Sequence, residues 1–132
     1  MSSSSEFFIP LHWMEAICKG DVDGVLNMYS EKAVLVPTLV NEPIRGKEEL
    51  RAYFEGFLSK PNLCGDVHME IDQNLGNGYR SLSGTYTFRW DGEEGVEARY
   101  TFVVRHPTGF DGNSIGDWSI CTHHSSEYPF PS

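Results

Sequence analysis

The feature that most limits the possible folds is a series of alternating segments in the second half of the chain. Beyond Pro61, apolar and polar residues alternate with a period of two in four segments, 66–76, 79–90, 95–106 and 117–126. This is the period of a β-strand with one buried face. The sequence DGEEG at 91–95 predicts a hairpin loop between two of them, and a longer connection is expected at 107–116. The second half therefore predicts an antiparallel meander.

Helical patterns precede these strands. Residues 6–18 place apolar side chains at helical spacing. A short second helix is expected at 20–30, with Asp21 as its N-cap and Tyr29 on its buried face. A short strand is expected at 33–38 and a turn-rich loop at 41–46, and residues 46–60 carry the clearest apolar stripe of a helix. Helices followed by a meander predict an α+β fold, with residues 1–132 forming a single domain.

The predicted sheet has to curl around the helices, because one of its faces is strongly aromatic. Leu82, Tyr86, Phe88 and Trp90 lie on the same side of the segment 79–90. A curled sheet closed by helices forms a cone with a pocket inside it.

Composition restricts the partners and the compartment. The formal net charge is −9, which argues against nucleic acid and anionic membranes as partners. No apolar stretch approaches the roughly 18 residues that would span a membrane, and the N-terminus lacks the pattern of a signal peptide. Cys18, Cys64 and Cys121 are odd in number and widely spaced, so we expect free thiols and a reducing compartment, either cytoplasm or plastid stroma.

Three stretches carry a resemblance to a known family: GDVDGVLNMYSEKAVLVPTLVNEPIRGKEELRAYFEGFL, ARYTFVVR and HHSS. Together they resemble the association-domain group of the nuclear transport factor 2-like (SnoaL-like) superfamily, over about residues 10–129. That group includes the association domain of calcium/calmodulin-dependent protein kinase II and the iota-class carbonic anhydrases. The PT after the first strand, the YF..FL helix and the terminal HHSS are most similar to the iota-class branch.

The resemblance implies the cone-shaped fold, a homodimer formed through the sheet, and no cofactor. It also implies reversible hydration of carbon dioxide to bicarbonate at a hydrogen-bonding site that has no obligatory metal. The positions carried over are Thr38 of VPT, Tyr53 of AYFEGF, and a histidine and a serine of HHSS.

Strand alternation offers a choice between the two histidines and the two serines. Trp118 and Ile120 share a face with His124 and Ser126, and this more apolar face is expected to line the cone. His124 and Ser126 are therefore predicted as catalytic residues with Thr38 and Tyr53. A β-bulge at the strand end would exchange the two faces.

Four further residues are predicted to bind substrate. His123 and Ser125 are the neighbours on the opposite face, and Tyr100 and Phe102 are expected to form a dry wall for apolar carbon dioxide. The hydroxyl groups of the site would stabilise charge on the nascent bicarbonate, as in an oxyanion hole, and a neutral imidazole would orient the water or accept its proton.

Other chemistries have weaker support in the sequence. Adjacent histidines on a strand point to opposite faces, so His123 and His124 do not readily share a metal ion. A Ser-His-Asp triad has still weaker support, because no nucleophile elbow is evident in the sequence. Two rival functions stay open: a non-catalytic association domain, and a SnoaL-like enzyme acting on a small hydrophobic metabolite, which would need a roomier pocket with an acid–base carboxylate.

Overall fold

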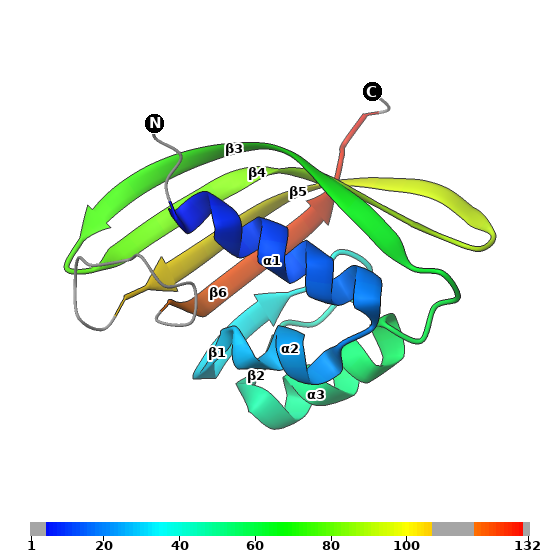
Figure 1. The fold of residues 1–132 in the computed structure, drawn as a ribbon, viewed down its shortest axis with the longest axis horizontal. Coiled ribbons are helices and arrows are strands. Elements are labelled where there is room, and N and C mark those ends of the chain that lie inside the picture. The colour runs from blue at the N-terminus through cyan, green and yellow to red at the C-terminus, as the bar shows by residue number, and fades with distance from the viewer. Residues whose placement is uncertain (1–4, 107–117, 131–132) are drawn as a thin grey trace.

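The chain folds as helices followed by a curled sheet (Figure 1), as the sequence predicts. The structure is a computed structural model that describes residues 5–106 and 118–130. Within these residues the helices are α1 (Ser5–Lys19), α2 (Val22–Asn27) and α3 (Gly46–Phe57). The strands are β1 (Tyr29–Val36), β2 (Ile44–Arg45), β3 (Cys64–Gly76), β4 (Tyr79–Trp90), β5 (Glu93–Arg105) and β6 (Ser119–Glu127). The connection predicted at 107–116 lies outside the described residues.

The strands form one sheet in the order β2-β1-β6-β5-β4-β3. The meander from β3 to β6 is antiparallel throughout, as predicted. The predicted antiparallel sheet has one exception, because β6 pairs with β1 in parallel. After β1 the chain passes through β2, α3 and the strands β3 to β5. The last strand, β6, then lies beside β1 and runs in the same direction. The two-residue β2, in a segment expected to be a loop, pairs with β1.

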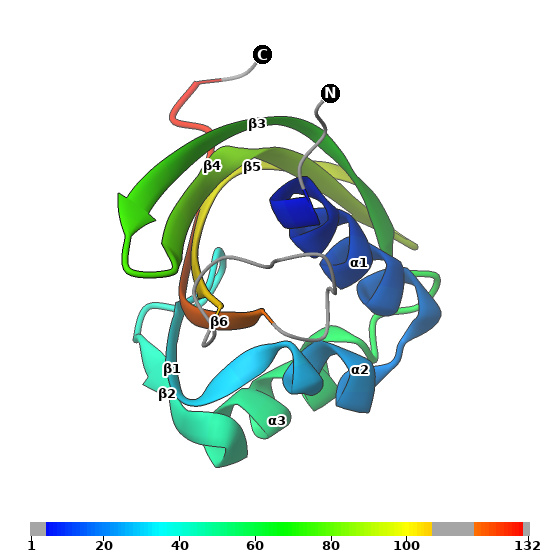
Figure 2. The same ribbon diagram turned by 60° about the vertical axis from the view of Figure 1, so that its left-hand side comes forward.

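The sheet curls around α1, which lies across its concave side (Figure 2). Long antiparallel strands twist and coil in this way when one face is covered. The buried face of β4 carries Leu82, Tyr86 and Phe88, each at most 4% exposed, and these side chains pack against α1 and α3 within a single core. The aromatic face that the sequence indicates is therefore the inside of the cone.

Helix α2 is shorter than its sequence pattern indicates. Asp21 caps it as predicted, since its side chain accepts a hydrogen bond from the backbone N–H of Gly24 at 3.0 Å. Tyr29, expected on the buried face of this helix, is instead the first residue of β1. Its side chain is still buried, and its position at the base of the cone becomes important for the site.

The expectation of free thiols is wrong for two of the three cysteines. Cys18, at the end of α1, forms a disulfide with Cys64, the first residue of β3. Sequence spacing does not show this pairing, because the two residues are 46 positions apart and meet only when α1 packs on the sheet. Cys121 is free and partly buried. No helix in the described part of the chain is long and apolar enough to cross a membrane.

Candidate active site in the cone

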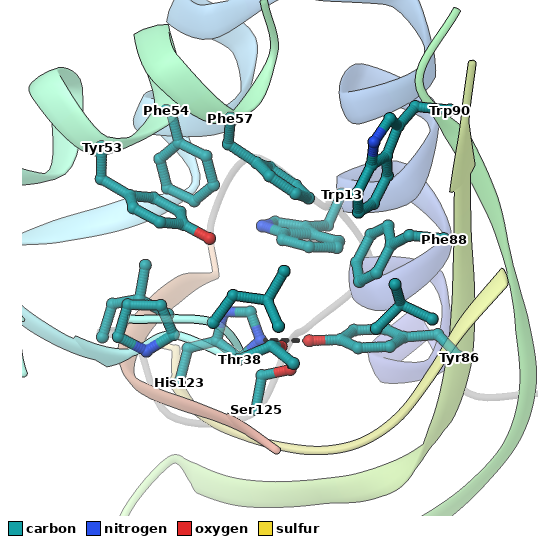
Figure 3. Close-up of a pocket in the computed structure, with 14 residues that line it drawn as sticks. Trp13, Thr38, Tyr53, Phe54, Phe57, Tyr86, Phe88, Trp90, His123 and Ser125 are labelled. Atoms are coloured by element: carbon teal, nitrogen blue, oxygen red, sulfur yellow. Dashed lines mark hydrogen bonds between the residues drawn. The ribbon is translucent and has the colours of Figure 1, made fainter. Parts of the chain in front are cut away.

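A cavity lies between α1, α3 and the concave face of the sheet (Figure 3). Its free volume is about 30 Å³, enough for roughly two water molecules or one molecule of a few heavy atoms. Leu39 at its rim is half-exposed, so the cavity reaches the surface there. The lining residues are Trp13, Leu35, Pro37, Thr38, Leu39, Tyr53, Phe54, Phe57, Tyr86, Phe88, Trp90, Val96, His123 and Ser125.

Most of the cavity wall is aromatic. Trp13 of α1 stacks on Tyr86 of β4, with ring centroids 5.6 Å apart, and meets the edge of Phe88 at 6.0 Å. Tyr53 and Phe57 of α3 stack at 5.7 Å on the other side. These contacts between large rings make a rigid, apolar enclosure.

Among the described residues, four that carry a hydroxyl group line this enclosure: Thr38, Tyr53, Tyr86 and Ser125. Thr38, just after β1, is hydrogen-bonded to Ser125 of β6, and the two lie side by side on the cavity floor. Tyr53 directs its hydroxyl into the cavity (Figure 3), where it has no hydrogen-bond partner among the described residues. Burial raises the pKa of Tyr53 to about 12, so its hydroxyl stays protonated and can donate to a ligand. The structure thus brings the predicted Thr38 and Tyr53 to the same cavity.

His123 forms the base of the cavity and is 1% exposed. Its Nδ1 lies 2.8 Å from the Tyr29 hydroxyl and its Nε2 lies 3.0 Å from the Tyr86 hydroxyl. Phe102 stacks beneath the imidazole at 3.9 Å. Burial lowers the pKa of His123 to about 3, with a smaller contribution from His124. The imidazole is therefore neutral at physiological pH.

The predicted assignment of the two faces of β6 is wrong. His123 and Ser125 point into the cone, whereas His124 is exposed and Ser126 lies on the outer face, where its Oγ accepts a hydrogen bond from Arg99 at 3.2 Å. The cause is a bulge at Cys121: Val103 of β5 pairs with Thr122, and the next residue, Val104, pairs with Ile120. The extra residue keeps Trp118 and Ile120 inside and exchanges the faces beyond it.

The predicted dry wall of Tyr100 and Phe102 is also not found. Both side chains are buried, but neither lines the cavity. Phe102 lies behind His123, on the side away from the cavity. The Tyr100 hydroxyl passes next to Gly84, which has no side chain, and donates a hydrogen bond to Glu70 Oε1 at 2.9 Å.

Sequence reasoning missed three residues of the site, Trp13, Tyr29 and Tyr86. Their positions on apolar faces were visible, and each carries a polar atom that needs a partner when buried. That signal indicates a hydrogen-bonded core but does not show that the three converge on His123.

His123 is the one His, Cys, Asp or Glu side chain among the described residues that line the cavity. Among the described residues, no three His, Cys, Asp or Glu side chains gather in a way that would hold an ion. The ring nitrogens of His123 are already hydrogen-bonded to two tyrosines. That the site needs neither metal nor cofactor stays a prediction.

Comparison with known proteins places this cone and its inner cavity in the nuclear transport factor 2-like class. The model of the SnoaL-like domain matches residues 11–110, and the chain belongs to this family. No curated protein matches the sequence.

Solved structures agree with the family assignment. A Xanthomonas campestris protein described as a calcium/calmodulin dependent protein kinase II association domain is 32% identical, with a TM-score of 0.75 over 90% of this chain and 82% of that one. A Streptomyces avermitilis protein described as a dehydratase of the nuclear transport factor 2-like family is 14% identical, with a TM-score of 0.78 over 96% and 95% of the two chains. A ketosteroid isomerase-like protein from Erwinia carotovora is 13% identical, with a TM-score of 0.67 over 95% and 94%. The last two are similar in fold alone.

Proposed function

We propose that the protein hydrates carbon dioxide at the cone cavity, without a metal ion, as the motifs shared with iota-class carbonic anhydrases imply. The observation that carries the proposal is a cavity of about 30 Å³ with apolar walls and the Thr38–Ser125 hydroxyl pair on its floor. The inner histidine and serine, His123 and Ser125, replace His124 and Ser126 as the residues of HHSS that serve the site.

The size and the walls of the cavity suit carbon dioxide. The molecule has three heavy atoms and no net dipole, so it partitions into apolar surroundings. The aromatic side chains around the cavity provide such surroundings, and they reduce the number of competing waters.

The same features argue against an enzyme for a larger metabolite. Isomerisation and dehydration of carbon acids need a base near the substrate, commonly a carboxylate. In the part of the chain that the structure describes, none of the residues lining the cavity is Asp or Glu. A substrate of ten or more heavy atoms would also need several times the available volume.

The groups around the cavity are electrically neutral, and this restricts the chemistry. His123 is held neutral because its pKa is lowered to about 3, and Tyr53 because its pKa is raised to about 12. An imidazole with so low a pKa is a weak base. The site is therefore suited to a proton transfer that leaves no net charge on the protein.

The Thr38–Ser125 pair provides such a transfer. The oxygen of a bound water attacks the carbon of carbon dioxide, and one C=O bonding pair moves to its oxygen. One hydroxyl of the pair accepts a proton from the attacking water, and the pair delivers another proton to that carbon dioxide oxygen. The product is carbonic acid, both hydroxyls are restored, and the acid loses its proton in neutral solution.

Tyr53 complements this relay. Its hydroxyl, which has no hydrogen-bond partner in the described part of the chain, donates to the oxygen on which negative charge develops, as a donor in an oxyanion hole does. Because the donor is fixed on α3 and surrounded by rings, it needs little reorganisation during the reaction.

The test is a stopped-flow assay of carbon dioxide hydration on protein treated exhaustively with a chelator, with its metal content measured in parallel. We expect a saturable rate above that of buffer in metal-free protein. Absence of any such rate in folded protein refutes the proposed function. Activity that disappears on chelation and returns with one equivalent of zinc refutes the metal-independent site.

A further inference from the structure

We propose that Trp13, Tyr29 and His123 form a directed chain of hydrogen bonds that turns the Tyr86 hydroxyl toward the cavity as a donor. The assignment follows from the geometry of four buried side chains. The use of Tyr86 by the substrate rests on the proposed function, whereas the direction of the chain does not.

The first link has a fixed direction. The indole Nε1 of Trp13 lies 3.0 Å from the Tyr29 hydroxyl oxygen. An indole N–H donates and never accepts. The Tyr29 oxygen is therefore an acceptor from Trp13.

In the second link, between Tyr29 and His123, only one placement of the protons gives every donor an acceptor. Tyr29 is 2% exposed, and its hydrogen-bond partners among the described residues are Trp13 and His123. If Nδ1 of His123 carried a proton and donated to Tyr29, the Tyr29 proton would have no acceptor. An orphaned buried donor costs about 1–3 kcal/mol. The Tyr29 hydroxyl therefore donates to Nδ1.

This direction decides the tautomer of His123. A neutral imidazole carries one proton, so when Nδ1 accepts, Nε2 is protonated. Nε2 is 3.0 Å from the Tyr86 hydroxyl and donates to it. The opposite tautomer would make Tyr86 a donor to histidine and turn its proton away from the cavity.

The last link faces the cavity. With its oxygen accepting from His123, Tyr86 keeps its own O–H for the cavity side, where Ser125 or a bound substrate can accept it. Burial raises the pKa of Tyr86, and a hydrogen bond with Ser125 opposes the rise, so the group remains a hydroxyl. Donors in series polarise one another, which strengthens the terminal donor. Tyr86 is thus a second substrate-facing donor beside Tyr53, and Trp13, Tyr29 and His123 are positioning residues.

The direction of the hydrogen-bond chain can be tested without substrate by NMR of ¹⁵N-histidine-labelled protein. Two-bond ¹H–¹⁵N correlations report which ring nitrogen is protonated, and His123→Gln assigns the signals. We expect Nε2 protonated and Nδ1 a hydrogen-bonded acceptor, unchanged between pH about 5 and 8. A protonated Nδ1, or an imidazolium at pH 7, overturns the proposal.

Two phenylalanine variants distinguish the loss of a hydrogen bond in this chain from a general effect on packing. Tyr29→Phe is expected to shift the Nδ1 resonance toward that of a free acceptor, whereas Tyr53→Phe leaves the His123 resonances in place. These shifts also assign the signals if His123→Gln does not fold. Equal effects of the two variants contradict the chain.

The role of Tyr86 has its own readout. Tyr86→Phe is expected to lower the hydration rate about 10²–10³-fold, the typical cost of one oxyanion donor. A change of less than about twofold in folded protein overturns its role. If the wild-type protein shows no hydration at all, the proposed function fails, and the NMR result still decides the direction of the chain.

Discussion

Each residue of HHSS has a matched neighbour on the opposite face of β6, and this makes the site testable one side chain at a time. Ser125 is 4% exposed and hydrogen-bonded to Thr38, while Ser126 lies on the outer face. We predict that Ser125→Ala lowers carbon dioxide hydration about 10²–10³-fold. Ser126→Ala, the same chemical change one residue away, should alter the rate less than about twofold. A greater loss with Ser126→Ala in a stopped-flow assay would contradict the assigned face.

Thr38 and Ser125 should behave as one unit, because each hydroxyl is the other's partner. Thr38→Val and Ser125→Ala are each expected to interrupt the proton relay. The double variant should therefore be little slower than the slower single variant, since residues that act together have non-additive effects. Rates that multiply in the double variant would indicate two independent contributions and no relay.

His123 should make stability depend on pH. Its pKa is about 3 in the folded protein against 6.5 for a free imidazole, so below pH 6.5 the unfolded state binds a proton that the folded state does not. The free energy of unfolding should then fall as pH falls, by roughly 1 kcal/mol per pH unit between pH 6 and 4. This contribution is fully present above pH 6.5.

Urea unfolding of His123→Gln at several pH values checks this expectation. The variant should lose that part of the slope, while His124→Gln, on the exposed face, should keep it. An unchanged slope in His123→Gln would show that this histidine titrates normally.

At the residue scale, the sequence predicts the site in part. Thr38 and Tyr53 were predicted because the family resemblance implies them, and at both positions regular periodicity gives the direction of the side chain correctly. The histidine and serine were assigned to the wrong face because one extra residue at Cys121 reverses the alternation. A bulge depends on how β6 pairs with β5, and no local pattern in CTHHSS marks it.

At the scale of elements, the disulfide between α1 and β3 fixes the helix that carries Trp13 against the sheet. Its sequence separation of 46 residues corresponds to about 4 kcal/mol in the loop-entropy treatment. We predict that Cys18→Ser lowers the free energy of unfolding by a few kcal/mol. Cys121→Ser, which removes the free thiol, should change it by less than about 1 kcal/mol.

Urea denaturation with and without a reductant measures this effect. Reduction should lower the stability of the wild-type protein to about that of Cys18→Ser and leave the variant unchanged. Equal stability of wild type before and after complete reduction would contradict a stabilising role for the disulfide.

The elements themselves were predictable where they are long and periodic. The strands of the meander and the helix at 46–57 follow from alternation and an apolar stripe. The parallel pairing of β1 with β6 and the short strand β2 were not predictable, because both depend on pairing with segments that are not adjacent in the chain. The Cys18–Cys64 pairing was missed for the same reason.

At the scale of the whole molecule, the two faces of the sheet differ in kind. The concave face holds the aromatic core and the cavity, whereas the outer face combines exposed apolar side chains, among them Met69 and Ile71, with Thr85, Arg99 and Thr101. Met69 is 47% and Ile71 57% exposed. Adjacent apolar residues on an exposed sheet face are typical of an interaction surface, and the family resemblance implies a homodimer through the sheet.

We therefore predict that the protein is a dimer in solution, joined through this outer face. Light scattering at micromolar concentration should give twice the chain mass of 14.9 kDa. Ile71→Lys should weaken the dimer at least about tenfold, because burying one such side chain is worth roughly 1.5–3 kcal/mol and a buried unpaired charge adds a further cost. Leu11→Lys, at a 38% exposed position on α1, is the matched control and should leave the mass unchanged.

A wild-type mass near that of one chain would contradict the dimer. A dimer that Ile71→Lys does not weaken would place the interface elsewhere. Because the cavity opens on the other side of the sheet, the monomeric variant should keep its hydration activity if the site is complete in one chain.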